Sequence, residues 1–107
     1  MFDALEVAIQ LVSKLKAPLA ELARYDTDLA RQARRAASGI ALSLDEGRRR
    51  AGKDRLHLFR IAAGSAAETR TALRLAEAWG YLDGGTLIDA GALLDRELAM
   101  LWRLTHR

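Results

Sequence analysis

Residues 87–104 read LIDAGALLDRELAMLWRL. Apolar side chains recur in this segment at every third or fourth position, a spacing that places them on one face of an α-helix. The stripe consists of Leu87, Ala90, Leu94, Leu98, Leu101 and Leu104. Just before it, Asp83 and Thr86 are both suited to capping the first turn of a helix. The segment therefore predicts an amphipathic helix that begins near residue 87.

The start of the chain carries a similar pattern, from about Asp3 to Arg24. Its apolar face consists of Leu5, Ile9, Val12, Leu15, Leu19 and Leu22. Pro18 interrupts this segment, and an internal proline removes one helix hydrogen bond and bends the axis. Because the apolar pattern continues across Pro18, we expect one kinked helix or two closely abutting helices. A clean break at Pro18 is the alternative.

Two further helices are predicted between these segments. Residues 25–28 form a polar turn rich in capping residues. The second helix follows it and ends near Arg48, with a face made of Leu29, Ala33, Ala36, Ile40 and Leu44. The third helix, with Asp54 as its candidate cap, continues to about Trp79 through Leu58, Ile61, Ala62, Ala72, Leu75 and Ala76. Gly80 stands where a left-handed helix terminus favours glycine.

Four helices with short connections predict an all-α fold, an antiparallel up-and-down four-helix bundle formed by one domain over residues 1–107. The chain has 107 residues, of which 50% are hydrophobic and 29% charged, as in ordinary globular domains. Asp3 and Glu6 interrupt the apolar run that a secretory signal would need, so we expect a cytoplasmic protein. Gly39 and Gly64, inside the second and third helices, are interpreted as sites of close helix packing.

Positive charge is concentrated in the middle of the chain. Residues 31–60 carry nine Lys and Arg against three Asp and Glu, a local net charge of +6 in a chain whose total is +3. Such asymmetry is typical of proteins that contact phosphate. The predicted nucleic-acid contacts are Arg31, Arg34, Arg35, Arg48, Arg49, Arg50, Lys53 and Arg55. The alternative is a solvated helix face with internal ion pairs.

No catalytic or cofactor site is indicated. The chain has no cysteine, which excludes thiol nucleophiles and cysteine metal sites. Asp45 and Glu46 are neighbours on a helix and therefore point in different directions, and His57 and His106 lack metal-ligand spacing. A hydrolase or nuclease that uses Asp45, Glu46 and His57 is a third hypothesis. The large aromatic residues Trp79, Tyr81 and Trp102 are expected in the core or in a subunit contact.

Several motifs resemble those of the bacterial four-helix-bundle family encoded in intervening sequences of 23S ribosomal RNA genes. Residues 32–37 resemble its QLRRA segment, residues 40–47 its SIPxNIAEG segment, residues 60–68 its RIAxGSxxE segment and residues 80–82 its GYL turn. Departures include Ala41 and Ser43 in place of the proline and asparagine of the second motif. The likeness extends over essentially the whole chain.

The resemblance implies a homopentamer, because relatives include the pentameric accessory variability determinant of diversity-generating retroelements. That relative has a basic surface and associates with a reverse transcriptase and nucleic acid. Our leading hypothesis is a non-enzymatic homo-oligomeric bundle that binds RNA or DNA through its basic surface, without a cofactor. The alternative is an adaptor or scaffold that docks an acidic protein partner, such as a reverse transcriptase, without direct contact with nucleic acid.

Overall fold

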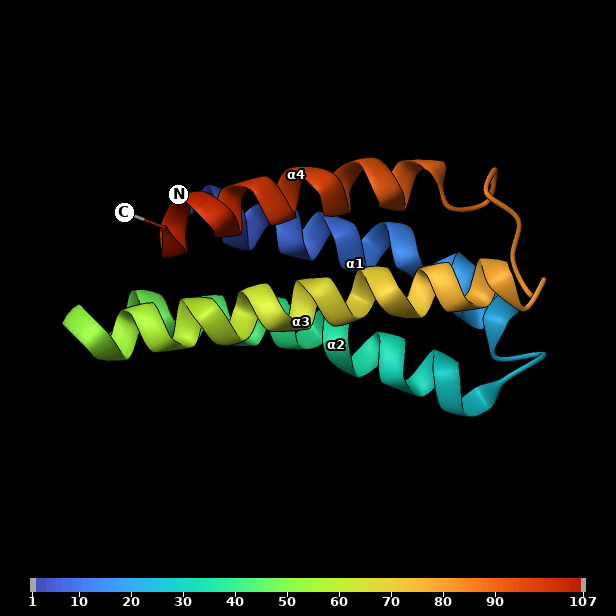
Figure 1. Ribbon diagram of the computed structural model, residues 1–107, viewed down its shortest axis with the longest axis horizontal. Coiled ribbons are helices and arrows are strands. Elements are labelled where there is room, and N and C mark those ends of the chain that lie inside the picture. Colours follow the sequence, from blue (N-terminus) through green and yellow to red (C-terminus); the bar gives the residue numbers. More distant parts are fainter. Residues whose placement is uncertain (1, 107) are drawn as a thin grey trace.

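The computed structural model describes residues 2–106 and forms an antiparallel bundle of α1 (Asp3–Leu22), α2 (Thr27–Arg48), α3 (Gly52–Ala78) and α4 (Ile88–Thr105). Successive helices run in opposite directions, so the two chain ends lie at the same end of the molecule (Figure 1). α2 and α4 each pack against both α1 and α3, which closes a ring around one core. The bundle measures 42 × 22 × 20 Å. The predicted all-α, up-and-down architecture is confirmed.

α1 continues without interruption through Pro18, which excludes the clean break. Its predicted apolar face is correct in the second half, where Leu15 and Leu19 are buried, and wrong in the first half. Ile9 and Val12 are 50% and 39% exposed. The residues that α1 buries are Ala4, Val7, Ala8, Leu11, Leu15, Pro18, Leu19 and Leu22. In the first half of α1 the core side combines Ala4 and Ala8 with Val7 and Leu11, and the small alanines let the helix approach its neighbours closely.

Two of the predicted helix ends are confirmed. The Asp26 carboxylate accepts a hydrogen bond from the backbone N–H of Leu29 at 2.9 Å and so caps α2. At the end of α3, Gly80 has a φ of +78°, which a residue with a side chain adopts at a cost. The N–H groups of Gly80 and Tyr81 bond the carbonyls of Glu77 and Ala76, both at 2.9 Å, in a Schellman motif.

The predicted N-terminal capping residues of α3 and α4 are wrong. α3 begins two residues before Asp54, with Ala51 at the N-cap and no capping side chain. α4 begins at Ile88, also without a side-chain cap. Asp83 instead closes the preceding turn, because its Oδ1 accepts hydrogen bonds from the Thr86 N–H at 2.9 Å and the Thr86 hydroxyl at 3.1 Å. These bonds to the ionised carboxylate lower the pKa of Asp83.

Glycines bring α2 and α3 into close contact, but not all of the predicted ones do so. A Cβ on Gly39 would lie 3.2 Å from the Ser65 Oγ, which confirms its packing role. Gly64 is exposed with no heavy atom within 4 Å of such a Cβ, so its predicted packing role is wrong. The tightest approach is at Gly47, where a Cβ would lie 2.8 Å from the Phe59 Cε1.

The core contains one acidic residue that was not predicted from the sequence. Glu97 is fully buried in α4, and within residues 2–106 neither of its carboxyl oxygens has a hydrogen-bond partner. Burial raises the pKa of Glu97 to about 8, an effect that the neighbouring Arg96 charge only partly opposes. The spacing already contained the signal, since position 97 lies three residues after Leu94 and four before Leu101 on the buried stripe.

Candidate nucleic-acid interface

Five of the eight predicted contact residues form one basic corner, at the end of α2 and the start of α3. The chain reverses direction through residues 49–51 only. Gly52, with a φ of +59°, supplies the backbone conformation that this short reversal needs. The residues of the basic corner are Arg48, Arg49, Arg50, Lys53 and Arg55, and all of them are exposed. The fold therefore gathers five cations at one end of the bundle.

The other three predicted residues lie apart from this corner. Arg31, Arg34 and Arg35 are exposed on the first half of α2. Arg35 and Arg48 are separated by thirteen residues of helix, which at a rise of about 1.5 Å per residue is about 20 Å. The predicted set is thus a cluster at the bundle end together with a second group farther along α2.

Ion pairs on α2 engage several of these arginines. Asp45 binds both Arg48 at 3.0 Å and Arg49 at 3.2 Å. Glu46 binds Arg50 at 3.2 Å. The spacings of three and four residues along a helix bring these partners together, as the ion-pair alternative predicted. Ion pairs this exposed contribute only about 0–1 kcal/mol each to stability. A phosphate can therefore replace the carboxylates at the same guanidinium groups at a small cost in free energy.

Arg31 pairs with Asp28 at 3.2 Å in the same way. Arg34, Arg35 and Lys53 have no ion-pair partner among residues 2–106. Arg55 donates a hydrogen bond to the backbone carbonyl of Arg48 at 3.1 Å, which satisfies a carbonyl at the end of α2 and braces the corner. A guanidinium has five N–H donors, so Arg55 keeps others for a ligand.

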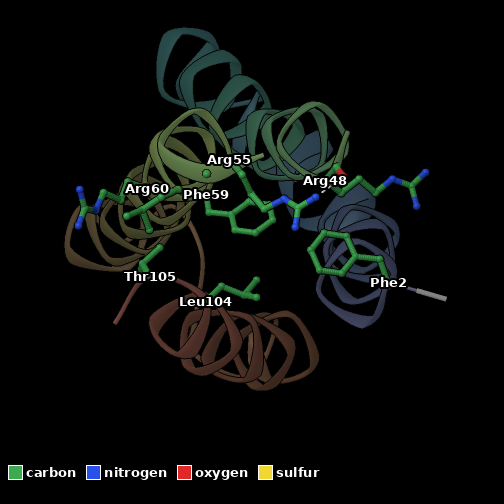
Figure 2. Close-up of a pocket in the computed structure, with 9 residues that line it drawn as sticks. Phe2, Arg48, Arg55, Phe59, Arg60, Leu104 and Thr105 are labelled. Carbon is green, nitrogen blue, oxygen red and sulfur yellow. Dashed lines mark hydrogen bonds between the residues drawn. The ribbon is translucent and has the colours of Figure 1, made fainter. Parts of the chain in front are cut away.

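A pocket of about 530 Å³ adjoins the basic corner at the same end of the bundle (Figure 2). Its lining combines arginine with apolar side chains and includes no carboxylate: Phe2, Arg48, Gly52, Arg55, Leu56, Phe59, Arg60, Leu104 and Thr105. The Phe2 and Phe59 ring centroids are 5.8 Å apart, with the rings tilted by 34°. In Figure 2 the Arg55 side chain reaches toward the space between these rings, whereas Arg48 and Arg60 point outward.

The sequence reading did not include Phe2, Phe59 or Arg60 in the site. The signal that was available is topological, because the starts of the first and third helices lie at the same end of an up-and-down bundle. Nothing in the spacing of the residues shows that two phenylalanines fifty-seven positions apart meet there.

The large aromatic side chains are not core residues in two of the three predicted cases. Trp79 and Trp102 are 68% and 60% exposed, so the core interpretation is wrong for both, and a subunit contact remains a prediction. Tyr81 stacks on Tyr25 with centroids 5.6 Å apart and on Trp79 at 6.3 Å. This aromatic group lies at the α1–α2 and α3–α4 connections, the end of the bundle opposite the basic corner (Figure 1).

Two of the three residues of the hydrolase hypothesis take part in ion pairs. The carboxylates of Asp45 and Glu46 are engaged with arginines, and His57 is exposed. Over residues 2–106, no three His, Asp or Glu side chains are grouped closely enough to hold a metal ion. None of the helices described here has the length and apolar character needed to cross a membrane.

Comparison with known proteins gives two matches. A family model described as 23S rRNA-intervening sequence protein matches residues 2–103. The crystal structure of a protein with unknown function from the S23 ribosomal protein family, from Bacteroides thetaiotaomicron, has the same fold with a TM-score of 0.87. The two chains share 14% identity, over 97% of this chain and 99% of that chain. Among curated proteins, no sequence matches significantly.

Proposed function

Because the chain belongs to the 23S rRNA-intervening sequence protein family, as its motifs predicted, we propose that it is a non-enzymatic, homo-oligomeric bundle that binds RNA or DNA. The observation that carries this proposal is the basic corner. Five exposed cations from one helix end and the next helix start occupy a small surface at the end of the bundle. Arginine suits this role because its planar fork binds two phosphate oxygens at once.

The energetics of the corner favour a phosphate over the existing partners. The arginines at positions 48, 49 and 50 pair with carboxylates one helical turn away, and Arg49 also donates a hydrogen bond to the backbone carbonyl of Asp45 at 3.3 Å. A phosphate neutralised by these cations also releases counterions from the nucleic acid, which adds affinity without regard to sequence. Arg34 and Arg35 add a second exposed positive group about 20 Å farther along α2.

Self-association is part of the proposal, with five subunits as the number that the family resemblance implies. Its structural support is a set of large apolar side chains that the single chain leaves in solvent: Ile9, Val12, Leu42, Ile61, Leu75, Trp79, Ile88 and Trp102. Subunit contacts would remove this surface from water. Light scattering at micromolar concentration tests the assembly, and a strictly monomeric mass would defeat it.

The second candidate function is that of an adaptor. For both candidates we expect a cytoplasmic location. The basic corner of the adaptor would dock an acidic protein such as a reverse transcriptase. The observation in its favour is that the corner already binds carboxylates, those of Asp45 and Glu46. An acidic protein surface offers the same chemical group, and complementary charge accelerates such an encounter.

Titration of labelled RNA and DNA at several salt concentrations, followed by fluorescence anisotropy, separates the two candidates. Binding through three to five phosphates gives a log–log dependence on salt with a slope of about −2 to −4. We expect affinity that falls along such a slope for both nucleic acids. Absence of binding at low salt would eliminate the nucleic-acid proposal and leave the adaptor.

A further inference from the structure

The pocket beside the basic corner has properties that phosphate binding does not require. Phe59 lines the pocket with a side chain that is only 6% exposed. Its ring packs against Gly47, where there is no room for a side chain. Phe2 stands opposite, immediately before α1, where its backbone carbonyl accepts a bond from the Glu6 N–H at 3.1 Å. Leu56 and Leu104 complete the apolar wall. An apolar, aromatic cavity thus opens directly beside a cluster of arginines.

We propose that this pocket receives one unpaired nucleobase of a single-stranded RNA or DNA, while Arg55 holds the phosphate attached to it. This inference rests on the proposed function and deepens it, because it names single strands as the preferred ligand. Unpaired bases are commonly recognised by packing on aromatic side chains and arginine planes. The volume of about 530 Å³ lies in the range of pockets that enclose small organic ligands.

The geometry also indicates how the base packs. Ring centroids 5.8 Å apart leave no room for a base between Phe2 and Phe59. The base therefore lies across the two rings and against Leu104, beside the Arg55 guanidinium, which reaches toward the space between the rings (Figure 2). The lining contains no carboxylate that would repel the phosphate, and Arg48 and Arg60 add positive charge at its rim.

This arrangement predicts an order of affinities opposite to that of a purely electrostatic surface. A duplex has the higher charge density, so contacts with phosphate alone favour duplex over single strand. A duplex keeps its bases paired and stacked, so it cannot fill the pocket. Preference for single strands is therefore the signature of the pocket.

The test compares a single-stranded oligonucleotide with a duplex of the same length by fluorescence anisotropy, using the full chain free of any tag. Phe2→Leu removes one ring but keeps apolar bulk, and Tyr25→Leu removes a ring that is 59% exposed at the opposite end of the bundle as a matched control. We expect Phe2→Leu to weaken single-strand binding about tenfold, the scale of one base stack. Duplex affinity and the salt slope should not change, and Tyr25→Leu should leave every value as it is.

A second measurement needs no variant. Titration of adenosine monophosphate into the wild-type chain, followed by NMR, should shift the resonances of Phe2, Phe59 and Leu104. Equal affinity for single strand and duplex, without these shifts, would overturn the pocket proposal while leaving the phosphate-binding function intact. Failure of every nucleic acid to bind at low salt would remove the proposed function itself, together with the pocket's role.

Discussion

Glu97 gives the bundle an unusual dependence of stability on pH. Its carboxyl group is fully buried without a hydrogen-bond partner among residues 2–106, and its pKa is raised from 4.5 to about 8. Between these two values the folded chain keeps the proton while the unfolded chain has lost it. Unfolding therefore releases a proton, and the free energy of unfolding must fall as pH rises through this window.

The magnitude follows from the same two pKa values. One proton released per unfolding event lowers stability by at most about 1.4 kcal/mol for each pH unit. Between pH 5 and pH 7 the titration of Glu97 lowers the free energy of unfolding by about 2 kcal/mol, because its pKa rises from 4.5 to about 8 on folding. The stability of the fold therefore decreases as pH rises above the pKa that Glu97 has in the unfolded chain. An ordinary paired carboxylate, by contrast, stabilises the fold in that pH range.

Urea unfolding followed by circular dichroism, at fixed protein concentration, measures the effect. Glu97→Gln removes the titrating group, so its free energy of unfolding should lack the 2 kcal/mol fall between pH 5 and pH 7 that wild type shows. All other titratable groups are the same in both chains and cancel in the difference. Glu68→Gln, an exposed glutamate on α3, should retain the wild-type fall. Parallel pH curves for wild type and Glu97→Gln would refute the reasoning.

Three stability predictions concern glycines and a cap, and thermal or urea unfolding measures each of them. Gly47→Ala should lose about 1–3 kcal/mol, because the new Cβ would lie 2.8 Å from the Phe59 ring; wild-type stability would show that Phe59 can shift freely. Gly64→Ala should gain about 0.5–1 kcal/mol, since the site is exposed and open, and a loss would reveal a contact absent from the single chain. Asp26→Ala should lose about 1 kcal/mol with its bond to the Leu29 N–H, whereas an unchanged value would mean that water replaces the cap fully.

The architecture could be predicted from the sequence because helix periodicity, capping residues and short connections all indicate the same fold. The face of α1 could not. Two series of residues in its first half satisfy helical spacing, and the prediction followed the one with Ile9 and Val12, in which every member is bulky. The core instead buries Ala4, Val7, Ala8 and Leu11, and which face is buried depends on how closely the neighbouring helices approach.

The candidate site was predictable to the extent that its parts are local in sequence. Residues 48–55 gather at one corner because two helices meet there, and the ion pairs of Asp45 follow from spacings of three and four residues. The pocket depends on Phe2 and Phe59, which meet only through the tertiary fold. Glu97 was missed because a charged residue on a buried stripe is normally assigned to the surface.

The basic corner itself is tested most directly by removing the same number of positive charges at the corner in one variant and elsewhere on the bundle in another. One variant changes Arg48, Arg49 and Arg50 to Gln, which keeps helix propensity and avoids new repulsion with Asp45 and Glu46. A matched variant changes three exposed arginines elsewhere on α3 and α4, Arg70, Arg74 and Arg96, to Gln, so that both chains have the same net charge.

Anisotropy titrations of RNA against salt then compare these two variants with wild type. The corner variant should bind at least tenfold more weakly at low salt, with a salt slope shallower by about 2 to 3, because each lost phosphate contact removes about one unit. The matched variant should keep the wild-type slope. Equal losses in both variants would contradict a site at the corner and show that only the overall charge of the chain matters.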